Sequence, residues 1–301
     1  MSNNSFTLPS FAKINWNLRV LGKRDDGFHE LCTVFQTVSL HDSLTFAEAE
    51  KITFTCDDAA IPVNEENLVV KAAYALREKF GIKGGSAVHL EKRIPSPGGL
   101  GGGSSNAATA LIGLAKLWNI KIGIKELAQL GEQIGSDVPF FFYGGTALGT
   151  GRGTEITPIE DAEEKFLLIV APQISVSTRD AFARLNAPRL TNFDSKSILK
   201  ICRNEAENFR FNQAQLKNDF ESSVFALQPE IRRVKEKLLE CGAIQANLSG
   251  SGASVYAIFE NEETRQATLK ALEIESDWRM FAVATVSRQK YCKSLSISEI
   301  F

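Results

Sequence analysis

Apolar and β-branched residues gather in two neighbouring segments near the N-terminus, Ile14–Leu21 and Leu31–Leu40. Between them, Gly22–Glu30 is rich in charged and turn-forming residues. Two segments of this composition on either side of a polar turn are typical of β-strands. The pattern therefore predicts a strand, a loop and a second strand.

Helical spacing of apolar residues begins further along the chain. It runs from Leu68 to Phe80, with Asn67 placed to cap the start and Gly81 placed to end the helix. Periodicity and turn residues also predict a strand over Ala87–Arg93, helices from Ser104 to about Trp118 and from Ile124 to Ile134, and turns between strands over Gly144–Gly153.

The second half of the chain mixes both patterns. Phe166–Ala171 is a short apolar run typical of a buried strand, and Ser222–Cys241 predicts one long helix ended by Gly242. Strands and helices without strict alternation favour an α+β fold, which we divide near residue 158 into residues 1–158 and 159–301. The remaining predicted elements are strands at Ala243–Leu248, Ser254–Phe259 and Met280–Val286, and a helix at about Glu262–Glu273.

The composition is that of an ordinary globular protein, with 301 residues, 44% of them hydrophobic. Its 34 basic and 36 acidic side chains give a net charge of −2, so nothing favours binding to nucleic acid or an anionic membrane. No apolar run reaches the roughly 18 residues of a membrane span. The N-terminus lacks the layout of a signal peptide. We expect a monomer or homodimer that acts on a small molecule.

Cysteine and histidine spacing gives no metal-site motif. The five cysteines are odd in number and share no Cys-x-x-Cys spacing, which favours reduced thiols in the cytoplasm. Any metal is expected to be Mg²⁺ arriving with a nucleotide, with ligands that the sequence does not identify. The residues concerned are Cys32, Cys56, Cys202, Cys241, Cys292, His29, His41 and His89.

The most informative segment is Pro95–Leu111, in which five of the six positions from Gly98 to Gly103 are glycine. Ser104 and Ser105 then open the predicted helix. Glycine lets backbone N–H groups approach a ligand, and a helix N-terminus adds unpaired donors, which together favour binding of nucleotide phosphates. Neither the P-loop motif nor the dinucleotide fingerprint fits. A flexible hinge before a helix is the alternative.

Two further clusters carry polar chemistry. Lys13 and Asn15 lie on one side of the first strand, because alternate side chains share a face. A lysine on a solvated face is the alternative for Lys13. In Asn247–Phe259, the turn Ser249-Gly250-Ser251-Gly252 between two strands could hold an anion, or could be an ordinary hairpin turn.

Asp137 precedes the apolar run Val138–Phe142, so its carboxylate is expected against apolar neighbours. There it would need a cation such as Lys13 to stay ionised. The alternative is an N-cap for a helix that begins at Val138, with Pro139 in its first turn. A lysine–aspartate pair beside a bound triphosphate suits phosphoryl transfer to an alcohol.

Together, these clusters resemble the three motifs of the GHMP small-molecule kinases: an N-terminal lysine strand, a Pro-x-x-x-Gly-Leu-Gly-x-x-Ser-Ser loop and a late Gly-Ser-Gly turn. The resemblance covers nearly the whole chain and is strongest over residues 9–153 and 247–259. It implies an N-terminal domain like domain 2 of ribosomal protein S5, a ferredoxin-like C-terminal domain, and a substrate cleft between them.

Two segments narrow the resemblance within the family. Asp26–Leu31, with its Asp-Gly-aromatic-His pattern, and Gly135–Pro139 are similar to the members that phosphorylate the 2-hydroxyl of 4-diphosphocytidyl-2-C-methyl-D-erythritol with ATP. Those members serve the non-mevalonate route to isoprenoid precursors. Phe28 stands where they usually have tyrosine, which keeps a stacking face and loses a hydroxyl. Pro97 replaces a smaller residue and should stiffen the start of the loop.

By motif position, the resemblance implies that Asp137 is the general base and Lys13 its cationic partner. It also implies an adenine contact for Asn67. The phosphates would be held by the glycine loop, whose candidate residues are Pro95, Gly98, Gly99, Leu100, Gly101, Gly102, Gly103, Ser104 and Ser105. Substrate contacts are implied for Asn15, Phe28, His29, Thr178, Phe182, Gly250, Ser251 and Gly252, with the cytosine gripped by Phe28 and His29 and Phe182 as a second stacking face.

Three other functions compete with this interpretation. The first is another GHMP kinase, acting on mevalonate, homoserine or a sugar. The second is a nucleotide sensor of the same fold without catalysis, which would be expected to lack the base or the lysine. The third is a dinucleotide-dependent oxidoreductase, which the failed fingerprint disfavours.

Overall fold

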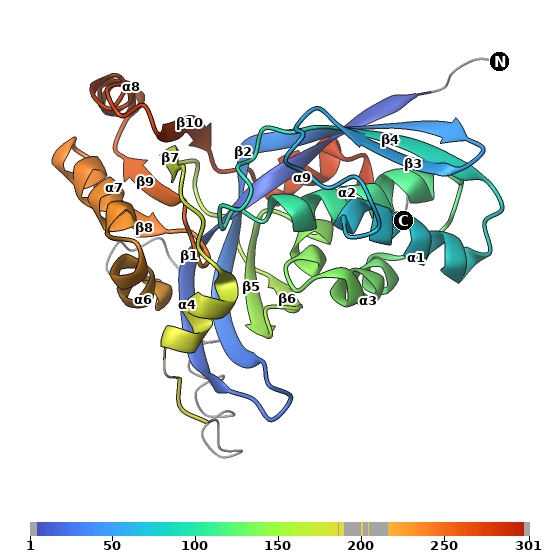
Figure 1. Cartoon of the computed structure of the whole chain (residues 1–301), viewed down its shortest axis with the longest axis horizontal. Helices are drawn as coiled ribbons and strands as arrows, with labels where there is room; N and C mark the ends of the chain where they lie inside the picture. Colours follow the sequence, from blue (N-terminus) through green and yellow to red (C-terminus); the bar gives the residue numbers. More distant parts are fainter. Residues whose placement is uncertain (1–4, 186, 190–199, 201–203, 205–215, 298–301) are drawn as a thin grey trace.

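Two β-sheets form two lobes in the computed structural model (Figure 1), which describes residues 5–185, 187–189, 200, 204 and 216–297. Within these residues the first sheet has six strands in the order β3-β4-β2-β5-β6, with β1 paired to β2. All neighbours are antiparallel except β3 and β4. The strands are β1 (Phe6–Lys23), β2 (His29–Ala49), β3 (Ile52–Cys56), β4 (Gly85–Glu91), β5 (Thr146–Gly151) and β6 (Glu155–Pro158).

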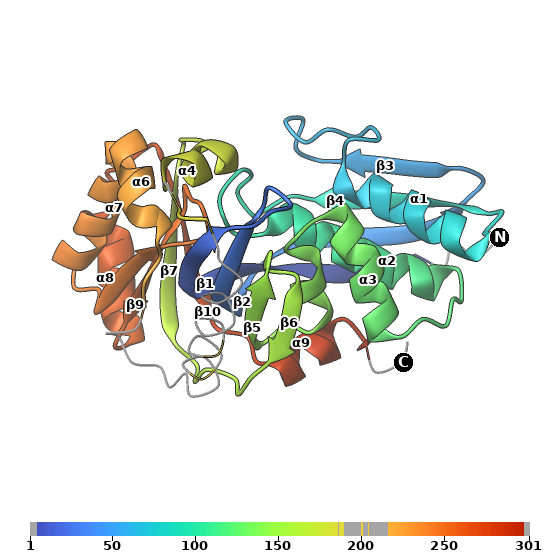
Figure 2. The same cartoon turned by 90° about the horizontal axis from the view of Figure 1, so that it is seen from below.

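Helices cover one face of the first sheet (Figure 2). Side chains from these helices and from β1, β2 and β4 form a buried apolar cluster that includes Phe46, Leu111 and Phe141. The same cluster takes in Tyr291, from a helix near the C-terminus that returns to the first lobe. The elements are α1 (Leu68–Phe80), α2 (Gly102–Leu117), α3 (Ile124–Ile134), the 3₁₀ helix η1 (Val138–Phe142) and α9 (Arg288–Ser294).

The second sheet is antiparallel, in the order β10-β7-β9-β8. Counted along this lobe, that order is 4-1-3-2, with helical connections between its first and second and its third and fourth strands, as in a ferredoxin-like fold. The elements are β7 (Phe166–Pro172), α4 (Thr178–Arg184), α6 (Phe220–Leu227), α7 (Pro229–Glu240), β8 (Gln245–Leu248), β9 (Val255–Phe259), α8 (Glu262–Ala271) and β10 (Trp278–Ala284).

Another apolar cluster joins the lobes. It packs Ile14 and Trp16 of β1 against Ile169 of β7 and Tyr256 of β9. The edge of the Trp16 ring meets Tyr256 with 5.5 Å between ring centroids. The long β1–β2 hairpin therefore packs in both lobes. The contact between Trp16 and Tyr256 fixes the positions of the two lobes on either side of the space between them. We keep the domain boundary near residue 158, between β6 and β7, as a proposal.

The structure confirms most predicted elements, including the caps of α1. Asn67 accepts a hydrogen bond from the Val69 N–H, and Gly81 ends the helix in a left-handed conformation with φ of 62°. The predicted strands of the N-terminal hairpin are present and longer than expected. Helix α9 had no counterpart in the sequence analysis.

Two predictions were wrong. The single helix over Ser222–Cys241 is divided into α6 and α7 at Gln228, because Pro229 has no N–H to continue the first helix and instead starts the second. The Gly144–Gly153 patch contains the buried strand β5. Its Gly149 pairs with β2, and a Cβ there would lie 2.5 Å from the Phe35 ring, so this glycine permits close packing rather than a turn.

No disulfide joins the cysteines of the described part of the chain, Cys32, Cys56, Cys241 and Cys292; Cys202 lies outside it. Among the described helices, none is long and apolar enough to cross a membrane.

Candidate active site

The glycine loop leads into the N-terminus of α2, as predicted. Gly99 and Gly101 have φ of 72° and 69°, a left-handed backbone that favours glycine. A Cβ at Gly99 would lie 2.1 Å from the Ser249 carbonyl oxygen, and one at Gly101 would lie 2.9 Å from Lys13 Cγ. Gly99 therefore excludes a side chain, and a side chain at Gly101 would displace Lys13. No side chain caps α2, so its first N–H groups can bind an anion.

The late Gly-Ser-Gly turn packs directly against the glycine loop. Ser249 Oγ donates to the Gly99 carbonyl at 3.0 Å, and the Ser254 N–H donates to the Gly98 carbonyl at 3.2 Å. On the other side of the turn, the hydroxyls of Ser251 and Thr178 are 3.0 Å apart. The turn is thus part of the site wall and not a separate hairpin end.

Lys13 is buried, which excludes the alternative of a lysine on a solvated face. Its side chain is 4% exposed, and its ammonium lies 3.3 Å from Asp137 Oδ2. Nζ also donates to Asn15 Oδ1 at 2.9 Å, and Asn15 Nδ2 donates to Thr33 Oγ1 at 2.7 Å. Irregularities in the β1–β2 register on both sides of Lys13 re-aim these side chains toward the loop. The Lys13 N–H donates to the Leu100 carbonyl at 2.9 Å, which ties strand and loop together.

Asp137 stands just before η1 and does not cap it. No side-chain capping bond forms, although Pro139 does lie in the first turn. The carboxylate is 34% exposed, so it is less enclosed by the apolar run than the sequence suggested. Its partner within the described residues is Lys13, and its open side faces the cavity.

A cavity of about 220 Å³ lies where the lobes meet. Half of its lining residues come from β1, β2 and the glycine loop, and most of the others come from the second lobe. Of the predicted residues it is lined by Lys13, Asn15, Gly99, Gly101, Asp137, Thr178, Phe182, Gly250, Ser251 and Gly252. Thr33, Phe35 and Pro97 line it as well. The sequence analysis missed Thr33 as a site residue, because the register irregularities hide which β2 side chains face Lys13.

The aromatic residues expected around the cytosine are arranged differently. His29 stacks on Phe182, with 4.6 Å between ring centroids and 21° between ring planes. Burial and the positive charge of Lys23 lower the pKa of His29 below its ordinary value of 6.5. Phe28 is 50% exposed at the hairpin turn, with the Arg152 guanidinium 4.3 Å from its ring centroid. Only Phe182 of the three lines the cavity.

Other predicted residues lie around the loop without lining the cavity. Ser105 is buried, and its hydroxyl meets that of Ser10 at 2.8 Å, facing the interior. Asn67 uses its amide to cap α1 and to donate to the Pro62 carbonyl. Leu100 is buried in the cluster that joins the lobes. Pro95, Gly98, Gly102, Gly103 and Ser104 complete the loop and the first turn of α2.

Comparison with known proteins agrees with this geometry. Residues 67–145 match the GHMP kinases N terminal domain, and residues 196–276 match the GHMP kinases C terminal domain. A 4-diphosphocytidyl-2-C-methyl-D-erythritol kinase of Thermodesulfovibrio yellowstonii is 40% identical over 275 residues, 89% of this chain and 94% of its own. One from Solibacter usitatus is 40% identical over 290 residues, 94% of this chain and 90% of its own.

Solved structures give the same result. A crystal structure of 4-(cytidine 5'-diphospho)-2C-methyl-D-erythritol kinase superposes with a TM-score of 0.74 at 29% identity, covering 93% of this chain and 99% of its own. A homoserine kinase from Cytophaga hutchinsonii, at a TM-score of 0.71 and 21% identity over 96% and 97% of the two chains, shares the fold. With this cavity, this fold and relatives of this identity over nearly its full length, the chain belongs to the GHMP kinases and, among them, to the 4-diphosphocytidyl-2-C-methyl-D-erythritol kinase family.

Proposed function

We propose that the chain transfers the γ-phosphoryl group of ATP to the 2-hydroxyl of 4-diphosphocytidyl-2-C-methyl-D-erythritol, giving the 2-phosphate and ADP. The substrate is the one named in its relatives. The observation that carries the proposal is the Lys13–Asp137 pair, 3.3 Å apart, in a cavity that also includes Gly99 and Gly101 of the glycine loop. Paired charges beside a phosphate loop suit phosphoryl transfer, which depends on positioning and charge stabilisation.

In this mechanism Asp137 is the general base. The substrate O–H donates its proton to the Asp137 carboxylate while its oxygen attacks the γ-phosphorus. The bond between that phosphorus and the β,γ-bridging oxygen breaks, and ADP leaves with the electron pair. The Lys13 ammonium pairs with the Asp137 carboxylate, and Asn15 Oδ1 accepts a hydrogen bond from this ammonium and so fixes its position. Asn15 also faces the cavity, where its amide would help to hold the polyol.

ATP would be bound through its phosphates at the N-terminus of α2. The backbone N–H groups of Gly101–Ser104 are the proposed donors, since the Ser105 N–H already donates to the Gly101 carbonyl at 2.8 Å. The partial positive charge of the helix end also favours the phosphates. Mg²⁺ would arrive with the nucleotide and spread its charge. Asn67 remains the proposed adenine contact.

The cytidyl end would lie against the aromatic side of the cavity. A base cannot enter between His29 and Phe182 without separating the two stacked rings. We therefore propose that it stacks against the pair as one wall or displaces His29, with the exposed Phe28 ring as the second face. Thr178 and the Gly250–Gly252 turn would contact the substrate beyond it. A cytoplasmic location stays the expectation from the cysteine pattern.

The first test is ADP release with Mg²⁺–ATP and four acceptors: 4-diphosphocytidyl-2-C-methyl-D-erythritol, mevalonate, homoserine and galactose. Turnover on the cytidyl compound alone supports the proposal. Turnover on another acceptor would keep the superfamily and overturn the substrate assignment. ATP binding with no turnover on any acceptor would instead favour a nucleotide sensor.

The second test addresses the base. Asp137→Asn should lower kcat by roughly 10²-fold or more, the usual contribution of a general base, with the Kd for ATP little changed. Glu163→Gln makes the same carboxylate-to-amide change at an exposed position outside the cavity and should leave kcat unaltered. An Asp137→Asn enzyme within threefold of wild type would remove the base assignment.

A further inference from the structure

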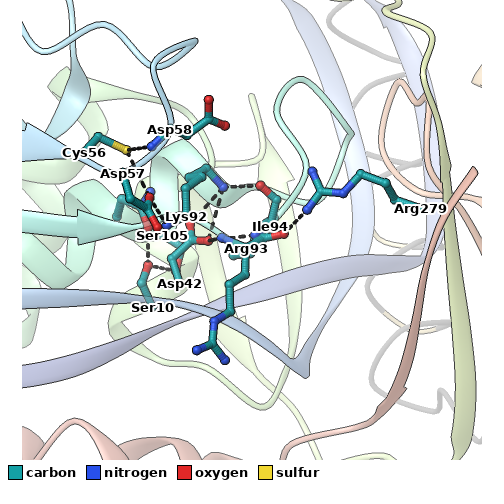
Figure 3. Close-up of polar contacts among 11 residues, drawn as sticks. Ser10, Asp42, Cys56, Asp57, Asp58, Lys92, Arg93, Ile94, Ser105 and Arg279 are labelled. Atoms are coloured by element: carbon teal, nitrogen blue, oxygen red, sulfur yellow. Dashed lines mark hydrogen bonds and ion pairs between the residues drawn. The ribbon is translucent and has the colours of Figure 1, made fainter. Parts of the chain in front are cut away.

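A buried carboxylate holds the chain just before the glycine loop (Figure 3). Asp42 lies in β2 with no exposed side-chain surface. Its Oδ1 accepts hydrogen bonds from the N–H groups of Arg93 and Ile94, both at 2.7 Å. These residues follow the end of β4 at Glu91, so no strand partner supplies these bonds. The Asp42 carboxylate instead supplies the hydrogen-bond acceptor that a neighbouring strand supplies for β4.

Lys92 balances the charge of Asp42. Its side chain is 4% exposed, and Nζ lies 3.0 Å from Asp42 Oδ2 and 3.2 Å from Oδ1. Nζ also donates to the Ile94 carbonyl, so the same side chain closes the segment on itself. Burial lowers the pKa of Lys92, while the charge of Asp42 opposes that change. A buried carboxylate without such a partner would be strongly disfavoured, so the two side chains form one unit.

Two exposed contacts complete the hold on this segment. Asp57, just after β3, accepts from the Lys92 N–H at 2.8 Å. Arg279, on β10 of the second lobe, donates to the Arg93 carbonyl at 3.1 Å (Figure 3). Backbone groups of three consecutive residues are thus held by side chains from three separate strands or strand ends and from both lobes.

The segment of residues 92–94 packs against Gly102, the first residue of α2. A Cβ on Gly102 would be 3.0 Å from Ile94 Cγ2 and 3.4 Å from Lys92 Nζ. Because the first residue of α2 rests on this pair, a shift of Lys92 or Ile94 would move the N–H groups to which the phosphates are assigned. Neither Asp42 nor Lys92 lines the cavity, so neither would contact the substrate there.

We propose that Asp42 is a positioning residue for the phosphate loop, which it sets by holding Arg93 and Ile94 while Lys92 neutralises it. This rests on the proposed function, because only there is the loop assigned to ATP. Asp42 acts through the backbone and is not a catalytic residue. Substitution of Asp42 should therefore weaken nucleotide binding more than binding of the acceptor substrate.

The test compares two double variants that both remove the buried charges. Asp42→Leu/Lys92→Met removes the acceptor for the two N–H groups. Asp42→Asn/Lys92→Gln keeps an acceptor oxygen and a polar partner. We expect the first to raise the Kd of the Mg²⁺ complex of a non-hydrolysable ATP analogue at least tenfold by calorimetry, with KM for the cytidyl substrate within twofold. The second should bind within threefold of wild type.

One control variant and one further test variant separate a positioning role from a general loss of stability. Glu275→Gln breaks the ion pair with Arg233 away from the cavity and should leave the Kd unchanged. Arg279→Gln changes an exposed residue, so it tests the same segment even if the Leu/Met variant does not fold; it should raise the Kd two- to fivefold. An unaltered Kd in either Asp42→Leu/Lys92→Met or Arg279→Gln overturns the proposal. Equal weakening in both double variants does so too, because the acceptor would then be irrelevant.

Nucleotide binding is measured here without the acceptor substrate. Wild-type protein that binds the ATP analogue and phosphorylates nothing would refute the proposed function and leave this test intact. Wild-type protein that does not bind the analogue would refute the assignment of the loop itself, and the positioning role with it.

Discussion

Replacing Gly101 by alanine tests the link between the glycine loop and Lys13. Gly101 has φ of +69°, and an added Cβ would lie 2.9 Å from Lys13 Cγ and 3.0 Å from the Phe141 ring. Gly81 provides a matched control, with φ of +62° and nothing within 4 Å of an added Cβ. A left-handed alanine costs roughly 1–2 kcal/mol at either position. The difference between the two variants therefore reports the contacts with Lys13 and Phe141.

The expected effect on catalysis follows from the geometry. Lys13 must move to admit the methyl group, and its ammonium is the partner of Asp137 in the cavity. A displacement of about 1 Å in a positioned group can lower the rate about 10²-fold. We expect Gly101→Ala to lower kcat by this factor, equal to about 2.7 kcal/mol of activation free energy. Gly81→Ala should keep wild-type kcat.

Coupled ADP release at saturating substrates gives kcat, and urea unfolding gives the free energy of unfolding of each variant. Both alanine variants should unfold more easily than wild type, and Gly101→Ala more so, because its Cβ also meets Lys13 and Phe141. If Gly101→Ala turns over within threefold of Gly81→Ala, then the position of Lys13 does not depend on the loop glycine, and the reasoning is refuted.

Three further predictions concern the nucleobase, pH and packing. Phe28→Ala should raise KM for the cytidyl substrate roughly five- to hundredfold if the base stacks there, since one stacked base contributes roughly 1–3 kcal/mol; an unchanged KM in steady-state assays would place the base elsewhere. The pKa of His29 in the folded protein lies below 6.5, so the unfolded chain binds a proton at this residue more readily, and stability is lost as pH falls below 6.5. In thermal melts below that pH, the Tm of His29→Gln should therefore fall less than the Tm of the wild type. Parallel Tm curves for the two proteins would contradict this prediction. Gly113→Ala would place a Cβ 2.4 Å from the Phe46 ring, and it should lower the free energy of unfolding in a urea titration by roughly 1–3 kcal/mol. The control is Gly103→Ala in the same helix, where the nearest atom to an added Cβ is 3.8 Å away. This variant should be neutral or stabilising in the same titration.

Local chemistry made much of the fold readable. Helix α1 begins after Asn67 and ends at Gly81, as the capping preferences of these residues dictate, because a cap depends on a few consecutive residues. The division of α6 from α7 was also local, since Pro229 cannot continue a helix, and it was overlooked because apolar residues continue across it. Gly149 was different: its role depends on the Phe35 ring of a neighbouring strand, which no local pattern contains.

The same division runs through the site. The glycine loop, the Gly-Ser-Gly turn, Lys13 and Asp137 could each be picked out from residue type and spacing, because phosphate binding and proton transfer demand particular groups. Their meeting in one cavity depends on the β1–β2 register and on packing between the lobes.

Most elements, the motifs and the chemistry they can support could be predicted from the sequence, because these depend on neighbouring residues. Long-range packing, in contrast, was needed to bury Lys13 against Asp137, to stack His29 on Phe182, and to bring Asp42 to the N–H groups of Arg93 and Ile94 just before the glycine loop. Each of those contacts joins residues far apart in the chain. Burial and partner are set by the packing of whole sheets and helices, which no short segment encodes.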